Sequence, residues 1–186
     1  MEASQAGDEN YNASSVLQTF NVTDSRKDNQ AISFNELSDK VYGDLPFNLT
    51  ATANSGLAVT YTATGPVSLE GDEVTIIGAG DVTITASQNG DDTFNPAPKV
   101  SQSFVVAKAV LTATAGDQSS TFGEAIPELT ISYAGFVGSD NSSNLDVLPT
   151  SGTTATVGSD AGDYEIKVTG GNDDNYEMDY VSGLLT

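Results

Sequence analysis

The stretch GLAVTYTATGPVSLEGDEVTIIGAGDVTITAS, from Gly56 to Ser87, decides the fold class. Near its end, Val82, Ile84 and Ala86 alternate with hydroxyl side chains, which is the two-residue period of a strand with one buried face. Glu70-Gly71-Asp72 forms a tight acidic turn between two further short strands. The stretch therefore predicts short antiparallel strands that pack into a sandwich.

The rest of the sequence favours strands as well. Thr, Val, Ser, Tyr and Phe recur, the chain holds 18 Gly, and no long segment has the 3.6-residue apolar period of a helix. The length of 186 residues is enough for two small sandwich modules of about 100 residues or fewer. We therefore predict an all-β protein of tandem immunoglobulin-like β-sandwiches.

Three short motifs recur in the same order, about 80 residues apart. The matched pairs are Tyr42-Gly43-Asp44 with Phe122-Gly123-Glu124, Ala79-Gly80-Asp81 with Ala161-Gly162-Asp163, and Gly90–Phe94 with Gly171–Tyr176. The third motif has another copy near the amino end, where ASQAGDENYN from Ala3 aligns with ASQNGDDTFN from Ala86. The chain is thus expected to contain repeated modules.

These repeats predict the domain organisation. Residues 1–24 would be the last two strands of a preceding repeat and the start of a linker, 25–108 a complete module, and 109–186 a second module whose last strand is cut short. The ends of the chain would then be boundaries of a fragment. We expect the polar linker 24–29 to flex, and the joint at 105–111 to be stiff because one strand leads almost directly into the next.

Strands are expected where apolar residues alternate between turn signals. A short helical turn is also expected between Phe136 and Val147, because GSDNSSNLD has capping residues there. The expected strands are 31–35, 47–53, 58–64, 67–69, 73–77, 81–87 and 100–106 in the first module, and 110–114, 129–133, 153–157, 164–168, 176–180 and 183–186 in the second.

Charge and composition exclude several function classes. The formal net charge of -20 disfavours nucleic acid and anionic membrane surfaces, because little positive charge is present to neutralise phosphates. No segment is long and apolar enough to suggest membrane insertion. The chain has no Cys and no His, so the usual nucleophile, general base and thiolate metal ligands are missing. We predict a non-enzyme; a glycosidase-like carboxylate pair is the weak alternative that residue counts leave open.

Calcium is the cofactor that this composition allows, because the ion binds carboxylate and carbonyl oxygens. The candidate ligands lie in the three copies of one loop, at Asp8, Asp91, Asp92, Asp173 and Asp174. No EF-hand or glycine-rich nonapeptide spacing accompanies them. The alternative is that these acids form turns and that Tyr11, Phe94 and Tyr176 tuck each loop against a core.

The aromatic-Gly-acid motif is interpreted as a device of backbone geometry. Gly43 and Gly123 permit a left-handed residue, and the nearby proline fixes the next turn. The aromatic residue would anchor the crossing between the first two strands of each module. Recurrence in both modules favours this structural role over a binding role.

Two resemblances to known families cover residues 30–186. The stretch quoted at the outset resembles the bacterial Ig-like repeats of surface adhesins. Residues 108–186 resemble the MBG domain of large secreted bacterial proteins, on the segments KAVLTATAGDQSSTFGEAIP, SYAGFVGSD, AGDYEIKVTG and NYEMDYVSGLL. The resemblances imply an extracellular or bacterial cell-surface location and a stalk or adhesive array without catalytic residues.

The functional prediction is therefore a spacer or stalk segment of an adhesin-like protein. The ligand of the parent protein, whether a cell-surface structure, a polysaccharide or a protein, is left open. The alternative is a binding module in which Phe136, Tyr164 and Tyr176, in loops at one end of the second module, grip a carbohydrate or protein. An unfinished last strand would also leave an open edge for self-association by strand addition.

Overall fold

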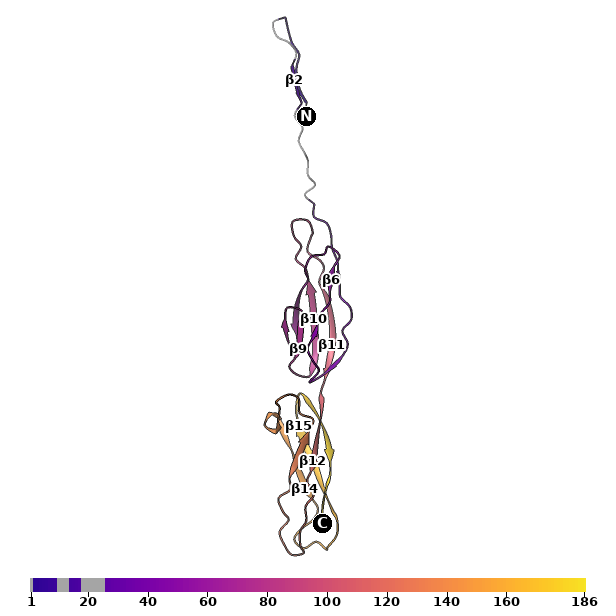
Figure 1. The fold of residues 1–186 in the computed structure, drawn as a ribbon, viewed down its shortest axis with the longest axis vertical. Coiled ribbons are helices and arrows are strands. Elements are labelled where there is room, and N and C mark those ends of the chain that lie inside the picture. Colours follow the sequence, from indigo (N-terminus) through magenta and orange to yellow (C-terminus); the bar gives the residue numbers. More distant parts are fainter. Residues whose placement is uncertain (1, 10–13, 18–25) are drawn as a thin grey trace.

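A computed structural model describes residues 2–9, 14–17 and 26–186. Two β-sandwiches follow one another along the long axis of the molecule (Figure 1). The fold is all-β with tandem sandwich-type sheets, as predicted. Among the described residues, no helix is both long enough and apolar enough to cross a membrane.

Near the amino end, β1 (Glu2–Gln5) and β2 (Ser14–Leu17) pair antiparallel, with Glu2 opposite Leu17. The hairpin predicted for this segment is confirmed. Its origin in a preceding repeat stays a prediction. Residues 18–20 and 24–25, on which part of the repeat alignment and of the linker depends, lie outside the described residues.

The first sandwich contains a four-stranded sheet in the order β4-β11-β10-β7, a three-stranded sheet β5-β9-β8, and the pair β3-β6. Its strands are β3 (Ile32–Ser33), β4 (Lys40–Val41), β5 (Phe47–Asn48), β6 (Thr52–Ala53), β7 (Thr60–Thr64), β8 (Val67–Glu70), β9 (Glu73–Ile76), β10 (Gly80–Ser87) and β11 (Val100–Ala107).

The core of the first sandwich lies between these sheets. On β10, Val82, Ile84 and Ala86 are fully buried, which confirms the alternation expected from the sequence. They pack in one cluster with Val74 and Ile76 of the facing strand β9. Fully burying an aliphatic side chain contributes about 1.5–3 kcal/mol of transfer free energy, so this two-sided cluster is what holds the sheets together.

The second sandwich packs the sheet β13-β12-β16 against β14-β15-β17. Ala113 and Ala115 of one sheet contact Ile166, Val168 and Leu185 of the other in its main core cluster. Its elements are β12 (Ala109–Ala115), β13 (Ile131–Ala134), the 3₁₀ helix η1 (Ser142–Asn144), β14 (Val147–Thr153), β15 (Tyr164–Asn172), β16 (Tyr176–Val181) and β17 (Gly183–Leu185).

The sequence repeat is also a repeat of strand pairing. Asp28 forms a parallel bridge with Phe94, and the parallel register of β12 on β16 places Ala109 opposite Tyr176 at the matching position. Likewise, the antiparallel pair Ile32–Ala53 recurs as Ala113–Tyr133. Equivalent residues of the two sandwiches can therefore be compared one by one.

The strand predictions were wrong at three places. The expected strand 47–53 is two short strands, β5 and β6, which lie in different sheets. The expected strand 153–157 is instead β14, which ends at Thr153. Pro149 and Gly152 are typical of loops, so the sequence of β14 does not indicate a strand. β14 tolerates the proline because it lies at a sheet edge. The two-residue strand β4, which pairs parallel with β11, was not expected. The helical turn is confirmed as η1, with Asn141 as a capping-box residue.

Candidate functional site: the joint between the sandwiches

The two sandwiches are joined through a single residue. β11 ends at Ala107 and β12 begins at Ala109, so only Lys108 lies between the last strand of one sandwich and the first strand of the next. The Lys108 ammonium donates a hydrogen bond of 2.6 Å to the backbone carbonyl of Asp173. The connection itself thus has little freedom to bend, and we call the region where the sandwiches meet the joint.

Three aromatic rings pack across the joint. Tyr42, from the turn after β4, lies edge-on to Tyr176 at the start of β16, with ring centroids 5.6 Å apart and an interplanar angle of 83°. Phe136 lies against the same ring at 5.5 Å and 86°. This edge-to-face arrangement is favoured for aromatic pairs. Tyr42 also contacts the core of its own sandwich, so one side chain connects both cores.

One carboxylate oxygen binds both tyrosine hydroxyls. Tyr42 Oη donates to Asp140 Oδ2 at 3.0 Å and Tyr176 Oη donates to the same oxygen at 2.7 Å, while the Val137 amide donates to Tyr176 Oη at 2.9 Å. Hydrogen bonds to a charged acceptor are stronger than those between neutral groups. Asp140 therefore fixes the position of the first sandwich's tyrosine relative to the second sandwich.

The same contacts alter the ionisation of the two phenols. Burial, then the hydrogen bond to Asp140 and the charges of Asp140 and Asp173, raise the pKa of Tyr42. Burial raises the pKa of Tyr176 still further, helped by Asp140 and opposed by the Val137 amide. Both hydroxyls thus stay protonated as donors throughout the neutral range.

Backbone contacts bring the sandwiches close together. Gly43 has a φ of +100°, and a Cβ atom added there would lie 2.8 Å from Val137 Cγ2. Glycine is therefore required both by the left-handed backbone and by the neighbouring sandwich. On the other side of the joint, the Ala79 amide donates to Asn175 Oδ1 at 2.9 Å. The first two repeated motifs of the first sandwich both contribute to the joint.

Asp173, a predicted calcium ligand, lies in the joint and organises its own loop. It is only 5% exposed. Its Oδ1 accepts hydrogen bonds from the amides of Asn175 and Tyr176, and its Oδ2 accepts one from the Asp146 amide. The amide of the exposed Asp174 donates in return to Asp146 Oδ2. These bonds are those of a turn-forming aspartate.

Asp91 makes the matching turn in the first sandwich. Its Oδ1 accepts from the amides of Thr93 at 2.7 Å and Phe94 at 2.8 Å. The Phe94 and then the Thr93 bonds lower the pKa of this carboxyl. Asp91, Asp92 and Asp8 are all exposed. In the described ranges, no three acidic, His or Cys side chains gather as a metal site would require. Calcium binding stays a prediction.

The aromatics named for a binding site do not share one end of the second sandwich, so that part of the prediction was wrong. Phe136 packs with the buried Tyr176 in the joint cluster. Tyr164 packs instead against the main core, and its hydroxyl donates to the Asp160 carbonyl. Phe122, expected to anchor a strand crossing, is 71% exposed.

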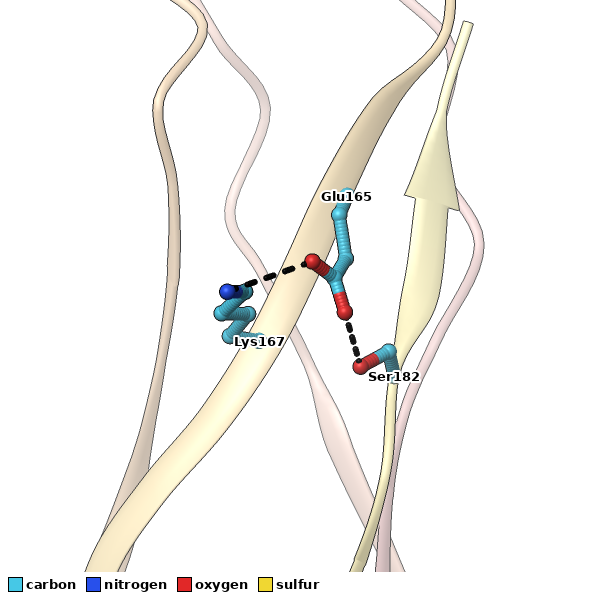
Figure 2. Close-up of polar contacts among 3 residues, drawn as sticks. All are labelled: Glu165, Lys167 and Ser182. Carbon is cyan, nitrogen blue, oxygen red and sulfur yellow. Dashed lines mark hydrogen bonds and ion pairs between the residues drawn. The ribbon is translucent and has the colours of Figure 1, made fainter.

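An exposed polar cluster on the second sandwich contrasts with the joint. Figure 2 shows Glu165 between Lys167 on the same strand and Ser182 before β17. The Ser182 hydroxyl donates at 2.7 Å and the Lys167 ammonium lies 3.4 Å away. The serine, and to a lesser degree the lysine, lower the pKa of Glu165. Water surrounds this cluster, so it resembles an ordinary surface ion pair and not a site.

Comparisons with known proteins find one family that the second sandwich resembles. A family model described as "MBG domain (YGX type)" matches residues 111–186. This part of the chain is similar to that family. MBG and Ig-like domains are typically non-enzymatic repeat modules, and the match is consistent with a structural or adhesive role and with extracellular proteins. No curated protein sequence matches the chain.

A solved structure similar to this chain is the crystal structure of the N-terminal four Ig domains of Dscam1 isoform 4.44. The TM-score is 0.36 at 12% sequence identity, and the similarity covers 83% of this chain. The match spans 45% of that structure's chain, which is less than half its length.

Sequence reasoning missed several residues of the joint. Asp140, Val137 and Asn175 were given no role, although the stiffness of the joint was predicted from the short connection. Asp140 and Val137 lie in a loop that has no counterpart among the repeated motifs. Asn175 does lie within a repeated motif, and the tyrosine beside it was the available signal for a contact at this position.

Proposed function

We propose that this chain is a spacer segment of a secreted or cell-surface bacterial protein, in which consecutive sandwiches hold a fixed relative orientation. The observation that carries the proposal is the joint: Tyr42 of one sandwich and Tyr176 of the next donate to the same Asp140 oxygen. A flexible tether between independent domains would not need a shared carboxylate or a glycine packed against its neighbour. The MBG match supports the extracellular setting.

The acidic surface fits this role. With 26 acidic and 6 basic residues, the chain repels its own copies and stays dispersed. The first sandwich is proposed to be a bacterial Ig-like repeat, in keeping with its sequence resemblance. The polysaccharide or protein bound by the parent protein would be contacted by other parts of that protein, and the segment described here would set their reach.

The test measures the relative orientation of the sandwiches. The chain has no Cys, so Ser68→Cys and Thr169→Cys introduce one spin label on an exposed strand position of each sandwich. Double electron–electron resonance should give a narrow distance distribution, which Tyr42→Ala should broaden. Phe122→Ala, which removes an exposed aromatic ring from the same repeat position, is the matched control and should leave the distribution narrow.

A broad distance distribution in the labelled chain that still carries Tyr42 would refute the spacer function. The calcium hypothesis is tested on the same labelled chain, with millimolar calcium and with chelator. Calcium that raises the melting temperature would support the ligand set at Asp8, Asp91, Asp92, Asp173 and Asp174. An unchanged melting temperature and distance would leave those residues as turn formers.

A further inference from the structure

The turn that forms the joint has a second copy at the opposite end of the second sandwich. Tyr42-Gly43 packs on the neighbouring sandwich, and its counterpart Phe122-Gly123 lies at the end that also carries Thr186, which we call the far end. Gly123 has a φ of +88°, close to the +100° of Gly43. Yet a Cβ on Gly123 would meet nothing within 4 Å, whereas one on Gly43 would collide with Val137.

The backbone ladder places the two turns equivalently. In the first sandwich the Tyr42 amide donates to the Ala107 carbonyl, at the end of the last strand. In the second, the Gln118 amide donates to Leu184 O and the Ser120 amide to Thr186 O. These backbone hydrogen bonds advance by two residues on each of the paired segments, so the next pairing position after Ser120 is Phe122. Phe122 therefore occupies the place that Tyr42 occupies at the joint.

The second part of the joint surface also has an exposed copy. At the joint, the Ala79 amide of the Ala79-Gly80-Asp81 motif donates to Asn175 of the next sandwich. Its counterparts Ala161 and Gly162 are exposed and line a hollow at the far end together with Phe122, Ile126 and Val157. An aromatic side chain with 71% exposure, beside a hollow lined by both apolar and polar side chains, is expected of a contact surface.

We propose that the far end of the second sandwich is a docking surface for a further sandwich module, one that presents an Asp-x-x-Tyr loop like Asp173–Tyr176. The proposal rests on the spacer function, because it extends the joint seen at Tyr42 to the next position in an array. Phe122 lacks the hydroxyl that Tyr42 donates to Asp140, so this contact uses the ring and the hollow. We expect the two modules to meet at the far end in the same arrangement as at the joint, but without a hydrogen bond from this aromatic residue to an aspartate.

An extended chain tests the docking surface. Residues 106–186 are appended directly after Thr186, which keeps the ladder in register because the added Val106 and Ala107 fall opposite the Phe122 turn. The appended copy presents its own Tyr176 and Val137 to the far end. Spin labels at Thr169→Cys in the original module and in the copy should give a narrow distance distribution.

Substitutions at Phe122 provide the discriminating result. In the extended chain, Phe122→Ala should broaden this distribution and lower the melting temperature of the copy by about 4–8 °C, whereas in the parent chain it should change neither the melting temperature nor the Ser68–Thr169 distance. Phe122→Tyr should raise the melting temperature of the extended chain, since it adds a donor for Asp140 of the copy.

The outcomes separate the two proposals. If Tyr42→Ala loosens the first joint but Phe122→Ala has no effect on the extended chain, the far end is not a docking surface and the spacer function stands. If the first joint is itself loose, the spacer function fails. If Phe122→Ala destabilises the parent chain as much as the extended chain, its role lies within its own sandwich and the docking proposal is overturned.

Discussion

The loops Asp91–Phe94 and Asp173–Tyr176 have the same hydrogen bonds but different surroundings. In each, an aspartate accepts from the amides two and three residues later. The aromatic residue then pairs with the segment that opens its module, Phe94 with Asp28 and Tyr176 with Ala109. Asp91 is exposed, whereas Asp173 is 5% exposed and accepts a further bond from Asp146. The local sequence thus makes the turn, and the packing around the turn decides whether it forms a joint.

The largest expected effect comes from the aromatic residue of each loop. Tyr176→Ala should lower the free energy of unfolding of the second sandwich by about 3–5 kcal/mol, because it removes a ring that is 3% exposed and packs in the core cluster at the joint. Phe94→Ala should cost less, since Phe94 is half-buried. Urea denaturation followed by hydrogen exchange would assign each loss to its sandwich. Equal losses of unfolding free energy in Tyr176→Ala and Phe94→Ala would contradict the difference in packing between the two loops.

The aspartates should differ in the same direction. Asp173→Ala leaves three backbone amides without their acceptor in a buried place, so we expect a loss of about 2–3 kcal/mol. Asp91→Ala exposes its two amides to water and should have a much smaller effect. Asp173→Asn, which keeps an acceptor oxygen, is the control and should recover part of the loss. Thermal melts of the four chains would show whether this order holds.

Alkaline pH should weaken the joint before it affects the first loop. The folded-state pKa values of Tyr42 and Tyr176 lie above the ordinary value of 10.0, so their stabilisation is complete below that pH and is lost as pH rises past it. Tyr176 alone accounts for about 1.4 kcal/mol per pH unit. In Tyr176→Phe the contribution of Tyr176 to this slope should disappear, whereas that of Tyr42 should remain. A wild-type chain whose free energy of unfolding stays constant from about pH 10 to about pH 11.5 would argue against buried tyrosine hydroxyls in the joint.

The smallest effect is expected at the exposed cluster of Figure 2. Lys167→Met should leave the melting temperature unchanged within error, because the Lys167 and Glu165 side chains are 66% and 52% exposed and water replaces the lost contact. This substitution tests whether burial, and not the mere presence of a polar contact, distinguishes the two regions. A clear fall in the melting temperature of Lys167→Met would show that exposed polar contacts also stabilise the second sandwich.

The sequence predicted those parts of the fold that depend on local pattern. The buried positions of β10, the hairpin near the amino end, the helical turn at Asn141 and the positive φ of Gly43 all follow from periodicity or from one residue's conformational freedom. β4 was missed because a two-residue strand has no detectable period, and β14 because its proline reads as a loop residue.

The joint was only half predictable. The expectation of a stiff joint follows from the short connection, and the structure confirms that a single residue lies between β11 and β12. The pairing of Tyr42 with Tyr176 through Asp140 does not follow, because these residues are far apart in the chain and meet only once both sandwiches have folded. A repeated motif reports that a position matters, but not whether it faces its own core or the neighbouring module.

The pairing of β12 with β16, together with the bridge from Gln118 to β17, determines how the second sandwich would bear mechanical load. β12 starts at the joint and runs parallel to β16, and Gln118 forms a parallel bridge with Leu185 of β17, next to Thr186. Tension applied between Lys108 and Thr186 would pull these strands in opposite directions along their length. The inter-strand hydrogen bonds would then be loaded together in shear instead of opening one after another. Because only Lys108 separates β11 from β12, no extensible linker would lengthen before the tension reached β12.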